Sequence, residues 1–280
     1  MEDAEQMCSK LRKCIKDNRL NDAKLLMKRL SREQRAAVAN TEHGGTSSPL
    51  SLAVLRQYDA FVNFLLEECD ADIEQLTDDA TPLYRAVSAS VKLDIVKILL
   101  SHGADVNVVC RGATPLYRAV SADFKLDIVK ILLSHGADVN VVCRGTTPLV
   151  EACCYEDIDL VRCLVENGAD IDRPDDNGIT CLMASVHGIS TEVALYLLEQ
   201  GASINAVDKS GATALHHAIQ GAYKYMDTVR LLVEHGADTS LCNEDGDNAL
   251  QYAALCGKEE IVEYLVGELN TTAQRLRLRV

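Results

Sequence analysis

Apolar residues along this chain recur in paired short stretches that polar residues separate. In residues 114–140 the first stretch places three apolar side chains at the spacing of one helix face: Leu116, Ala119 and Val120. Residues 121–123 interrupt this stripe, and residues 128–133 supply a second, broader apolar face. The pattern predicts two short helices joined by a turn.

Capping residues mark where each helix of this pair begins and ends. Thr114 suits an N-cap, because its hydroxyl can accept a free backbone N–H of the first turn. Pro115 suits the next position, where a missing N–H removes no hydrogen bond. Gly136 suits the end of the second helix, since it tolerates a positive φ. Residues 136–145 then read as an extended segment, which we call a finger.

The same capping pattern recurs along the chain at a nearly fixed interval. A residue suited to cap the first helix of a unit occurs at Ser48, Thr81, Thr114, Thr147, Thr180, Thr213 and Asn248. We call these positions the first-helix marks; successive marks are 33, 33, 33, 33, 33 and 35 residues apart. A fixed period of this length is typical of a repeat array, in which each unit buries its apolar face against its neighbours. We therefore expect an all-α solenoid of about seven units, packed closely enough to need only 4% aromatic residues.

One repeat is present as two nearly identical copies. Residues 80–112 and 113–145 differ only where Ser90 and Val91 are replaced by Asp123 and Phe124. Identical sequence can serve twice when each copy meets nearly the same surroundings. The duplication therefore predicts an additional structural unit and not a second active site.

The two ends of the chain depart from the repeat pattern. Residues 1–45 predict a helical capping pair and a linker, with Leu25, Leu26 and Leu30 on one face of the second helix. Residues 46–270 hold the repeats, and the last helix is expected at 259–269. We interpret residues 271–280 as a basic tail, either disordered or the start of a truncated segment.

Charge narrows the classes of partner. The net charge is −14, whereas residues 1–45 and residues 271–280 each carry +3, so the remainder is strongly acidic. Such a surface repels phosphate backbones, which argues against nucleic acid and favours a partner with exposed Lys or Arg. There is no apolar leader and no membrane-length apolar run. We expect a cytoplasmic or nuclear monomer with reduced cysteines.

The sequence holds no recognisable catalytic chemistry. The seven histidines and eleven cysteines form no ligand-spaced cluster, and no nucleophile or phosphate-binding motif occurs. We therefore predict a non-enzymatic protein without metal or cofactor. His102, His135 and His235 each precede a helix-ending glycine, which indicates a structural role.

The period and the Thr-Pro-Leu phrases resemble those of ankyrin-repeat proteins from Ser48 to Leu269. Within that class several phrases are similar to the N-terminal region of the Fem-1 family, including FVNFLLEECDADIE, DIDLVRCLVENGADID, HGISTEVALYLLEQGASIN and GATALHH. The ankyrin resemblance implies a protein-binding module that presents a concave surface of fingers and first helices. The Fem-1 resemblance implies a substrate-recognition adaptor of a Cul2-type cullin–RING ubiquitin ligase that reads C-terminal degrons.

The chain also departs from the Fem-1 pattern. The family's long loop between its first two repeats is short here, at residues 73–81, and its acidic pocket residue falls at Tyr155. The later helical repeats and the cullin-binding box do not occur. Two alternatives therefore stay open: a general protein-interaction module, and an adaptor with cullin–RING partners.

Residues on the predicted concave face that do not serve the repeat pattern are the candidate binding residues. They are Tyr84, Arg85, Ser88, Arg111, Tyr117, Arg118, Ser121, Arg144, Glu151, Tyr155, Asp176, Met183 and His187. Tyr and Arg are frequent at binding hot spots, and the duplicated blocks repeat them one unit apart. One hypothesis is a Tyr–Arg stripe that binds an acidic segment; the alternative is that the tyrosines support the fingers.

Overall fold

A computed structural model describes residues 4–41, 47–88, 92–121, 126–187, 190–221 and 225–277. The chain divides into two compact units, Met1–Cys143 and Arg144–Val280. Each unit is described by itself.

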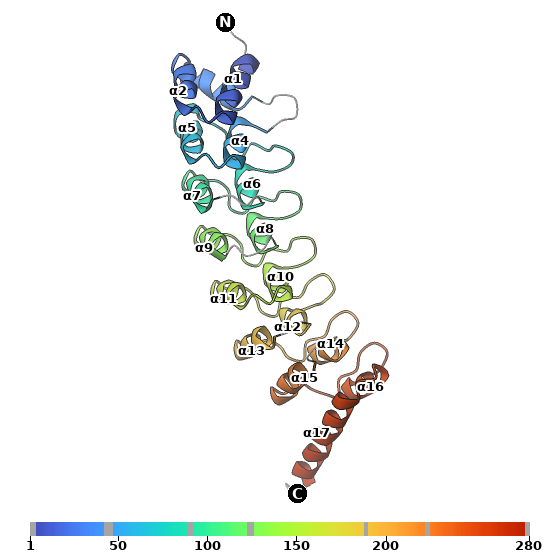
Figure 1. Ribbon diagram of the computed structural model, residues 1–280. Helices are drawn as coiled ribbons and strands as arrows, with labels where there is room; N and C mark the ends of the chain where they lie inside the picture. Colours follow the sequence, from blue (N-terminus) through green and yellow to red (C-terminus); the bar gives the residue numbers. More distant parts are fainter. Residues whose placement is uncertain are drawn as a thin grey trace. The chain divides into compact units, whose positions relative to one another are not determined.

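Two columns of helices form the first unit (Figure 1). The inner column stacks α1 (Ala4–Lys16), α4 (Pro49–Leu55), α6 (Pro82–Ser88) and α8 (Pro115–Ser121). The outer column stacks α3 (Arg32–Ala39), α5 (Asp59–Cys69), α7 (Leu93–Ser101) and α9 (Leu126–Ser134). The fingers leave the outer helices and return to the next inner helix, so they line the edge of the inner column (Figure 1).

The N-terminal cap differs from the expected helical pair, because the described residues before position 46 form three helices. The additional helix is α2 (Leu20–Lys28), which lies between α1 and α3 and also contacts α5. Helices α1 and α3 occupy the inner and outer places of a repeat. The cap is therefore a repeat-like unit with one helix added.

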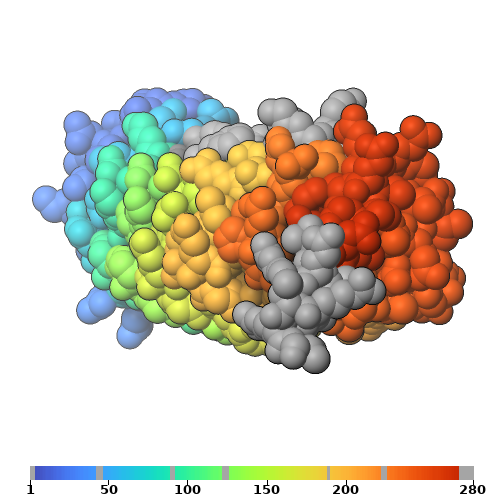
Figure 2. All heavy atoms as spheres, turned by 90° about the horizontal axis from the view of Figure 1, so that it is seen from below, coloured from blue at the N-terminus to red at the C-terminus, as the bar shows by residue number. Residues whose placement is uncertain are grey.

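The second unit follows the same plan. Its inner helices are α10 (Pro148–Cys154), α12 (Cys181–Ser185), α14 (Ala214–Gln220) and α16 (Ala249–Leu255). Its outer helices are α11 (Ile158–Glu166), α13 (Glu192–Glu199), α15 (Tyr225–Glu234) and α17 (Glu259–Arg277). Successive repeats of this unit lie against one another in the space-filling view, from yellow-green through orange to red (Figure 2). With α4–α9, the described residues contain seven inner–outer helix pairs, which confirms the predicted solenoid.

The predicted capping residues begin the inner helices. The Thr147 hydroxyl accepts the Val150 backbone N–H at 3.2 Å, and Thr114 accepts that of Tyr117 at 3.2 Å. Ser48 and Asn248 cap the first and last of these helices in the same way. These contacts satisfy donors that a helix start leaves without intrahelical partners. Each inner helix from α4 to α16 therefore begins directly after one of the predicted marks.

Aliphatic side chains build the core between the two columns. Leu83, Ile95 and Leu99 in the first unit are fully buried, as are Leu164 and Leu197 in the second. Their equivalents recur in each repeat, so in each unit an apolar layer lies between the inner and outer helices. Eight of the eleven cysteines are also buried and behave as small apolar residues.

The last helix is longer than its apolar pattern predicts. It was expected to end at Leu269, but α17 continues to Arg277 and takes in most of the segment interpreted as a disordered tail. Only Ile261 and Leu265 of its described side chains are buried. The helix continues because the residues after position 267 include neither Gly nor Pro, the two residue types that most disfavour a helix.

Candidate functional site

The tyrosines of the predicted Tyr–Arg stripe are buried. Tyr84 is 4% exposed and Tyr117 is 5% exposed. They pack with Ala80, Cys110 and Cys143 in a small cluster under the fingers of the first unit. Their side chains therefore offer little surface to a partner, and their packing matches the alternative interpretation, support of the fingers.

Two arginines of the stripe bond to the protein itself. The Arg85 side chain donates to the Thr77 carbonyl and forms an ion pair with Asp78 at 2.8 Å, and it is only 12% exposed. Arg118 Nε donates to Ser88 Oγ at 3.2 Å, which links two successive inner helices. The Ser121 hydroxyl bonds back to the Arg118 carbonyl at 3.4 Å. These side chains hold the first unit together and present little free binding capacity.

The finger tips of the first unit are tight turns. Arg111 and Gly112 both have positive φ, 53° and 75°, and Cys110 and Ala113 exchange two backbone hydrogen bonds across them. Positive φ at both central residues is the geometry of a type I′ hairpin. The Arg111 guanidinium donates to the Asp78 carbonyl at 3.1 and 2.5 Å, so it joins one finger to the preceding one. Arg144, at the start of the second unit, has the same backbone conformation, with φ 52°.

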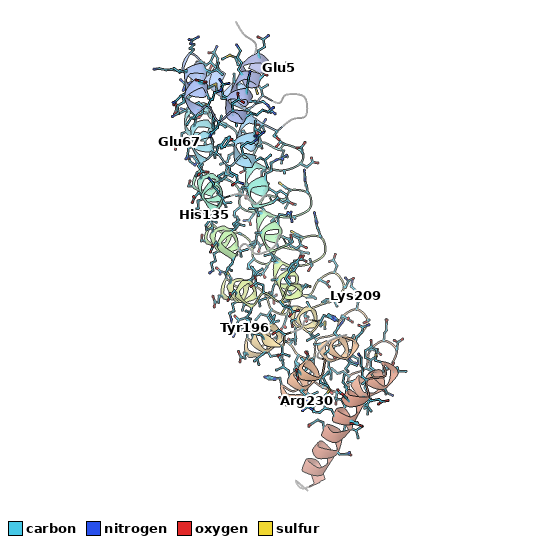
Figure 3. All side chains as sticks on the ribbon, in the orientation of Figure 1. Glu5, Glu67, His135, Tyr196, Lys209 and Arg230 are labelled. Carbon is cyan, nitrogen blue, oxygen red and sulfur yellow. The ribbon has the colours of Figure 1, made fainter. Side chains whose placement is uncertain are left out.

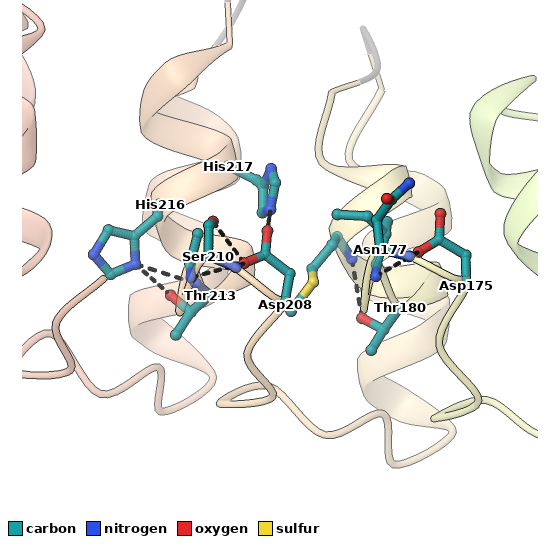
Figure 4. Close-up of polar contacts among 11 residues, drawn as sticks. Asp175, Asn177, Thr180, Asp208, Ser210, Thr213, His216 and His217 are labelled. Atoms are coloured by element: carbon teal, nitrogen blue, oxygen red, sulfur yellow. Dashed lines mark hydrogen bonds and ion pairs between the residues drawn. The ribbon is translucent and has the colours of Figure 1, made fainter. Parts of the chain in front are cut away.

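The second unit builds its finger tips differently (Figure 4). Asp175 Oδ1 accepts the backbone N–H groups of Asn177 and Ile179, at 2.7 and 2.8 Å. Asp208 and Asn243 make the equivalent pairs of bonds in the next two fingers. Each carboxylate or amide oxygen thus closes its own loop, which leaves the following residue at the tip exposed.

Backbone hydrogen bonds connect these finger tips in series. The N–H of Asp176 donates to the Gly145 carbonyl at 2.7 Å, that of Lys209 to Asn177 at 3.0 Å, and that of Glu244 to Ser210 at 2.7 Å. The side chains of Asp176, Lys209 and Glu244 remain exposed. The backbone of this surface is therefore fixed before any partner arrives.

Asp208 also contacts His217 of α14 (Figure 4). Its Oδ2 lies 2.8 Å from His217 Nε2, and the His187 ring meets the His217 ring edge-on, with centroids 5.3 Å apart. Burial raises the pKa of Asp208, but hydrogen bonds from Ser210, His217 and Ala212 outweigh it and leave that pKa lowered. Burial, together with the neighbouring charge of His217, lowers the pKa of His187.

Asp208 was not among the predicted site residues, although the sequence carries a signal for it. The spacing Asp-x-x-Gly occurs at Asp175–Gly178 and at Asp208–Gly211, with Asn243 in the corresponding place of the last finger. That spacing is typical of an Asp side chain that closes its own turn. Its second bond, to His217, depends on the packing of the finger against α14, so no short sequence pattern around Asp208 predicts it.

The remaining predicted residues of the second unit have different environments. Tyr155 is 46% exposed, and its hydroxyl donates to Glu151 Oε1 at 3.1 Å, so these two residues form one exposed pair at α10. His187 and Asp176 are exposed. Met183 is 1% exposed and belongs to the core, so its side chain offers no surface to a partner.

A shallow groove of about 160 Å³ lies between the last two fingers and α14 and α16. Gln220, Glu244, Asp245 and Tyr252 line it together with the finger base. We call the finger tips 175–178, 208–211 and 243–246, with the exposed side chains of α10, α12, α14 and α16, the finger face of the second unit. Lys209 lies on this side of the unit, whereas Tyr196 and Arg230 lie on the outer helices (Figure 3).

The residues that the structure describes contain no cluster of three or more His, Cys, Asp or Glu side chains placed to hold a metal ion. In the same residues, no helix combines the length and the apolar character needed to cross a membrane.

Comparison with known proteins agrees with this architecture. A family model described as "Ankyrin repeats (3 copies)" matches residues 50–143, 142–208 and 190–275. The crystal structure of the ankyrin repeat domain of Bcl-3, described as a unique member of the IkappaB protein family, superposes with a TM-score of 0.70. That likeness has 29% sequence identity and covers 80% of this chain and 99% of the Bcl-3 domain.

A shorter match relates the chain to a curated protein. Notch-regulated ankyrin repeat-containing protein B of Danio rerio is 43% identical over 51 residues, which is 18% of this chain. The match spans 46% of the length of that relative, a little under half. The repeat period, the stacked helix pairs and the family model, which extends over most of the chain, show that the chain belongs to the ankyrin-repeat family.

Proposed function

We propose that this chain is a non-catalytic binding module whose finger face in the second unit holds an extended, basic segment of a partner protein. Ankyrin repeats are in general protein-interaction modules, and that coarser role is what the family membership supports. The finger face supports the finer assignment, because it combines a fixed backbone with the exposed tip side chains of Asp176, Lys209 and Glu244.

The observation that carries the proposal is the series of finger tips that backbone hydrogen bonds connect to one another. Asp176, Lys209 and Glu244 are held one finger apart by backbone hydrogen bonds, while their side chains stay exposed. A surface that is already ordered loses little conformational entropy on binding. These side chains can therefore contact a partner at regular intervals along the array.

Charge on the finger face defines the partner. Asp176, Glu244 and Asp245 are exposed at the tips, where Lys209 is the opposing cation, and Glu151 adds a further carboxylate at α10. Complementary charge raises association rates and excludes partners of like charge. A segment that carries Lys or Arg suits this face better than an acidic or phosphorylated one.

No observation in the structure favours the narrower role of a degron-reading ligase adaptor. The residue at the family's acidic pocket position, Tyr155, bonds to Glu151 and provides no carboxylate of its own. The Fem-1 resemblance therefore stays a prediction from the sequence.

The double charge reversal Asp176→Lys with Asp245→Lys tests the proposal. Glu192→Lys with Glu199→Lys, on the exposed side of α13, changes the net charge equally and serves as the control. Affinity purification from native cells, followed by binding measurements with each recovered partner, should show about tenfold or greater weakening for the finger variant alone. Equal partner lists for wild type and finger variant would contradict the proposal, as would equal loss in the control.

A further inference from the structure

The cap helix α2 leaves its leucines outside the core. The sequence pattern assigns Leu25, Leu26 and Leu30 to a buried face, but Leu25 is 64% exposed and the other two are only half-buried. The buried side chains of α2 are Ala23 and Met27. An exposed cluster of large apolar side chains on a folded protein often marks an interaction site.

These leucines line a groove of about 610 Å³ formed by α1, α2 and the start of α3. Met7 of α1 supplies a further apolar side chain at its base. The volume lies within the range of roughly 300–1,000 Å³ common for binding pockets. The groove is open at the surface, so it suits a side-chain row from another molecule better than an enclosed small ligand.

The polar rim of the groove is positive. Lys10 and Arg29 line it, and in the part of the chain that the structure describes Arg29 has no ion-pair partner. Its acidic member, Asp22, lies 3.3 Å from Arg19, which also pairs with Asp17 at 2.8 Å. The two cations Lys10 and Arg29 outnumber the one carboxylate on the rim. This cap is a basic region in a chain whose net charge is −14. The groove therefore selects a ligand opposite in charge to the one that suits the finger face.

We propose that the α2 groove, meaning the groove lined by Met7, Leu25, Leu26, Leu30, Lys10 and Arg29, docks an acidic amphipathic helix of a partner protein. Apolar side chains of that helix, spaced at i, i+3, i+4 and i+7, lie against the leucines. Carboxylates beside them face Lys10 and Arg29. The proposal is independent of the finger face, because all of its residues lie in the first unit.

Synthetic helices provide the probe. The acidic peptide, of about 18 residues, carries Leu at the i, i+3, i+4 and i+7 positions and Glu on the remaining surface. A second peptide has Lys in place of Glu, and a third has Ser in place of Leu. Fluorescence anisotropy with the full chain should show binding of the acidic peptide and at least tenfold weaker binding of the Ser peptide. Any binding of the Lys peptide should be lost in Asp176→Lys with Asp245→Lys, because it belongs to the finger face and not to the groove. Absence of acidic-peptide binding, or equal binding of all three, overturns the proposal.

Variants of the chain locate the binding. Leu25→Ser changes an exposed side chain. It should weaken binding of the acidic peptide about fivefold or more, without loss of the helical circular dichroism signal. Lys10→Glu with Arg29→Glu should weaken it at least tenfold. Lys97→Glu with Lys130→Glu, on outer helices of the duplicated repeats, makes the same change in net charge and should leave binding unchanged. Equal weakening in this control overturns the assignment to the groove.

Two further measurements test other occupants of the groove, namely a second copy of the chain and a lipid surface. Sedimentation velocity of the chain alone tests whether a second copy fills the groove, and concentration-dependent association lost in Lys10→Glu with Arg29→Glu would overturn a separate partner. Co-sedimentation with anionic vesicles tests a lipid surface. Vesicle binding that Leu25→Ser abolishes, without acidic-peptide binding, would likewise overturn the proposal.

Discussion

At the scale of single residues, the finger tips of the second unit depend on glycines that another backbone approaches. Gly178 has φ 83°, and a Cβ placed on it would lie 2.9 Å from both the Asp208 Cα and the Lys209 backbone nitrogen. Gly168 has a similar φ, 87°, but a Cβ there would meet nothing within 4 Å. The pair separates the effect of backbone conformation from that of close packing between fingers.

We expect Gly178→Ala to destabilise the protein more than Gly168→Ala. Each loses about 1 kcal/mol through positive φ, and Gly178→Ala loses a further 1–3 kcal/mol, roughly, because neighbouring backbone must move. Urea denaturation of the two variants measures the difference. Equal losses would show that the fingers are not in firm contact at this point.

Single residues also show where sequence reasoning succeeds and fails. Thr114 and Thr147 were predicted as caps because capping is local, and their hydroxyls bond as expected. Tyr84 and Tyr117 were predicted as binding residues, but their burial depends on cysteines that approach from the following finger. Residue type indicates that a Tyr can bind a partner, while only the packing around it decides whether it is accessible.

At the scale of elements, successive repeats are joined by side chains at the end of each finger's first turn. Asn107 Oδ1 accepts the Asp138 N–H at 2.8 Å, and its Nδ2 donates to the Gly136 carbonyl at 3.1 Å. In the second unit, Asn205 accepts the Asp238 N–H in the same way. An amide side chain suits this position because it accepts from one backbone group and donates to another.

Glu74 occupies the same position and cannot make both bonds when ionised. Its Oε1 accepts the Asp105 N–H at 2.7 Å, while its buried Oε2 has no hydrogen-bond partner among the described residues. Burial raises the pKa of Glu74 above its ordinary value of 4.5; the bond from Asp105 opposes this shift, and the charges of Asp105 and Asp72 add to it.

Glu74→Gln should therefore stabilise the protein by about 1 kcal/mol at neutral pH, because the amide can donate where the carboxylate cannot. The folded state holds the Glu74 proton more tightly than the unfolded state, so the wild type gains stability as pH falls through the raised pKa. The advantage of Gln should then be largest at neutral pH and should shrink toward pH 4.5. Thermal denaturation across this range measures it.

Two controls keep this prediction specific. Glu33→Gln removes an exposed carboxylate from α3 and should change stability little. Glu74→Ala removes the acceptor for the Asp105 N–H and should not stabilise. A gain in Glu74→Ala equal to that in Glu74→Gln would mean that removal of charge, and not the added donor, is responsible.

The elements themselves follow the sequence pattern except at the ends. Interior helices begin and end at predicted marks, because each interior repeat meets a neighbour on both sides. The cap differs: Leu25 looks like a core residue in isolation, but α2 contacts α1 and α5 and buries Ala23 and Met27 instead. Helix α17 passes Leu269 because no Gly or Pro follows to end it.

At the scale of the whole molecule, stability in a repeat array is approximately a sum over units and their interfaces. In the first unit each inner helix contacts the next, α4 with α6 and α6 with α8, and the outer helices do likewise. The duplicated blocks make this testable, because Ala80 and Ala113 are each followed by the same residues. Removal of residues 81–113 therefore joins Ala80 to Thr114 and recreates a native junction.

We expect this deletion to leave a folded protein with one repeat fewer. Its denaturant m-value should fall by roughly an eighth, in proportion to the surface lost, and helical circular dichroism per residue should be preserved. Removal of residues 92–112 is the control, since it takes out α7 and its finger and leaves α6 without its outer helix. That variant exposes the apolar face that Ile95 and Leu99 now cover, so its unfolding midpoint should fall well below that of the in-register deletion. If both deletions lower the midpoint equally, the two copies are not interchangeable units, and the identical sequences must serve different surroundings.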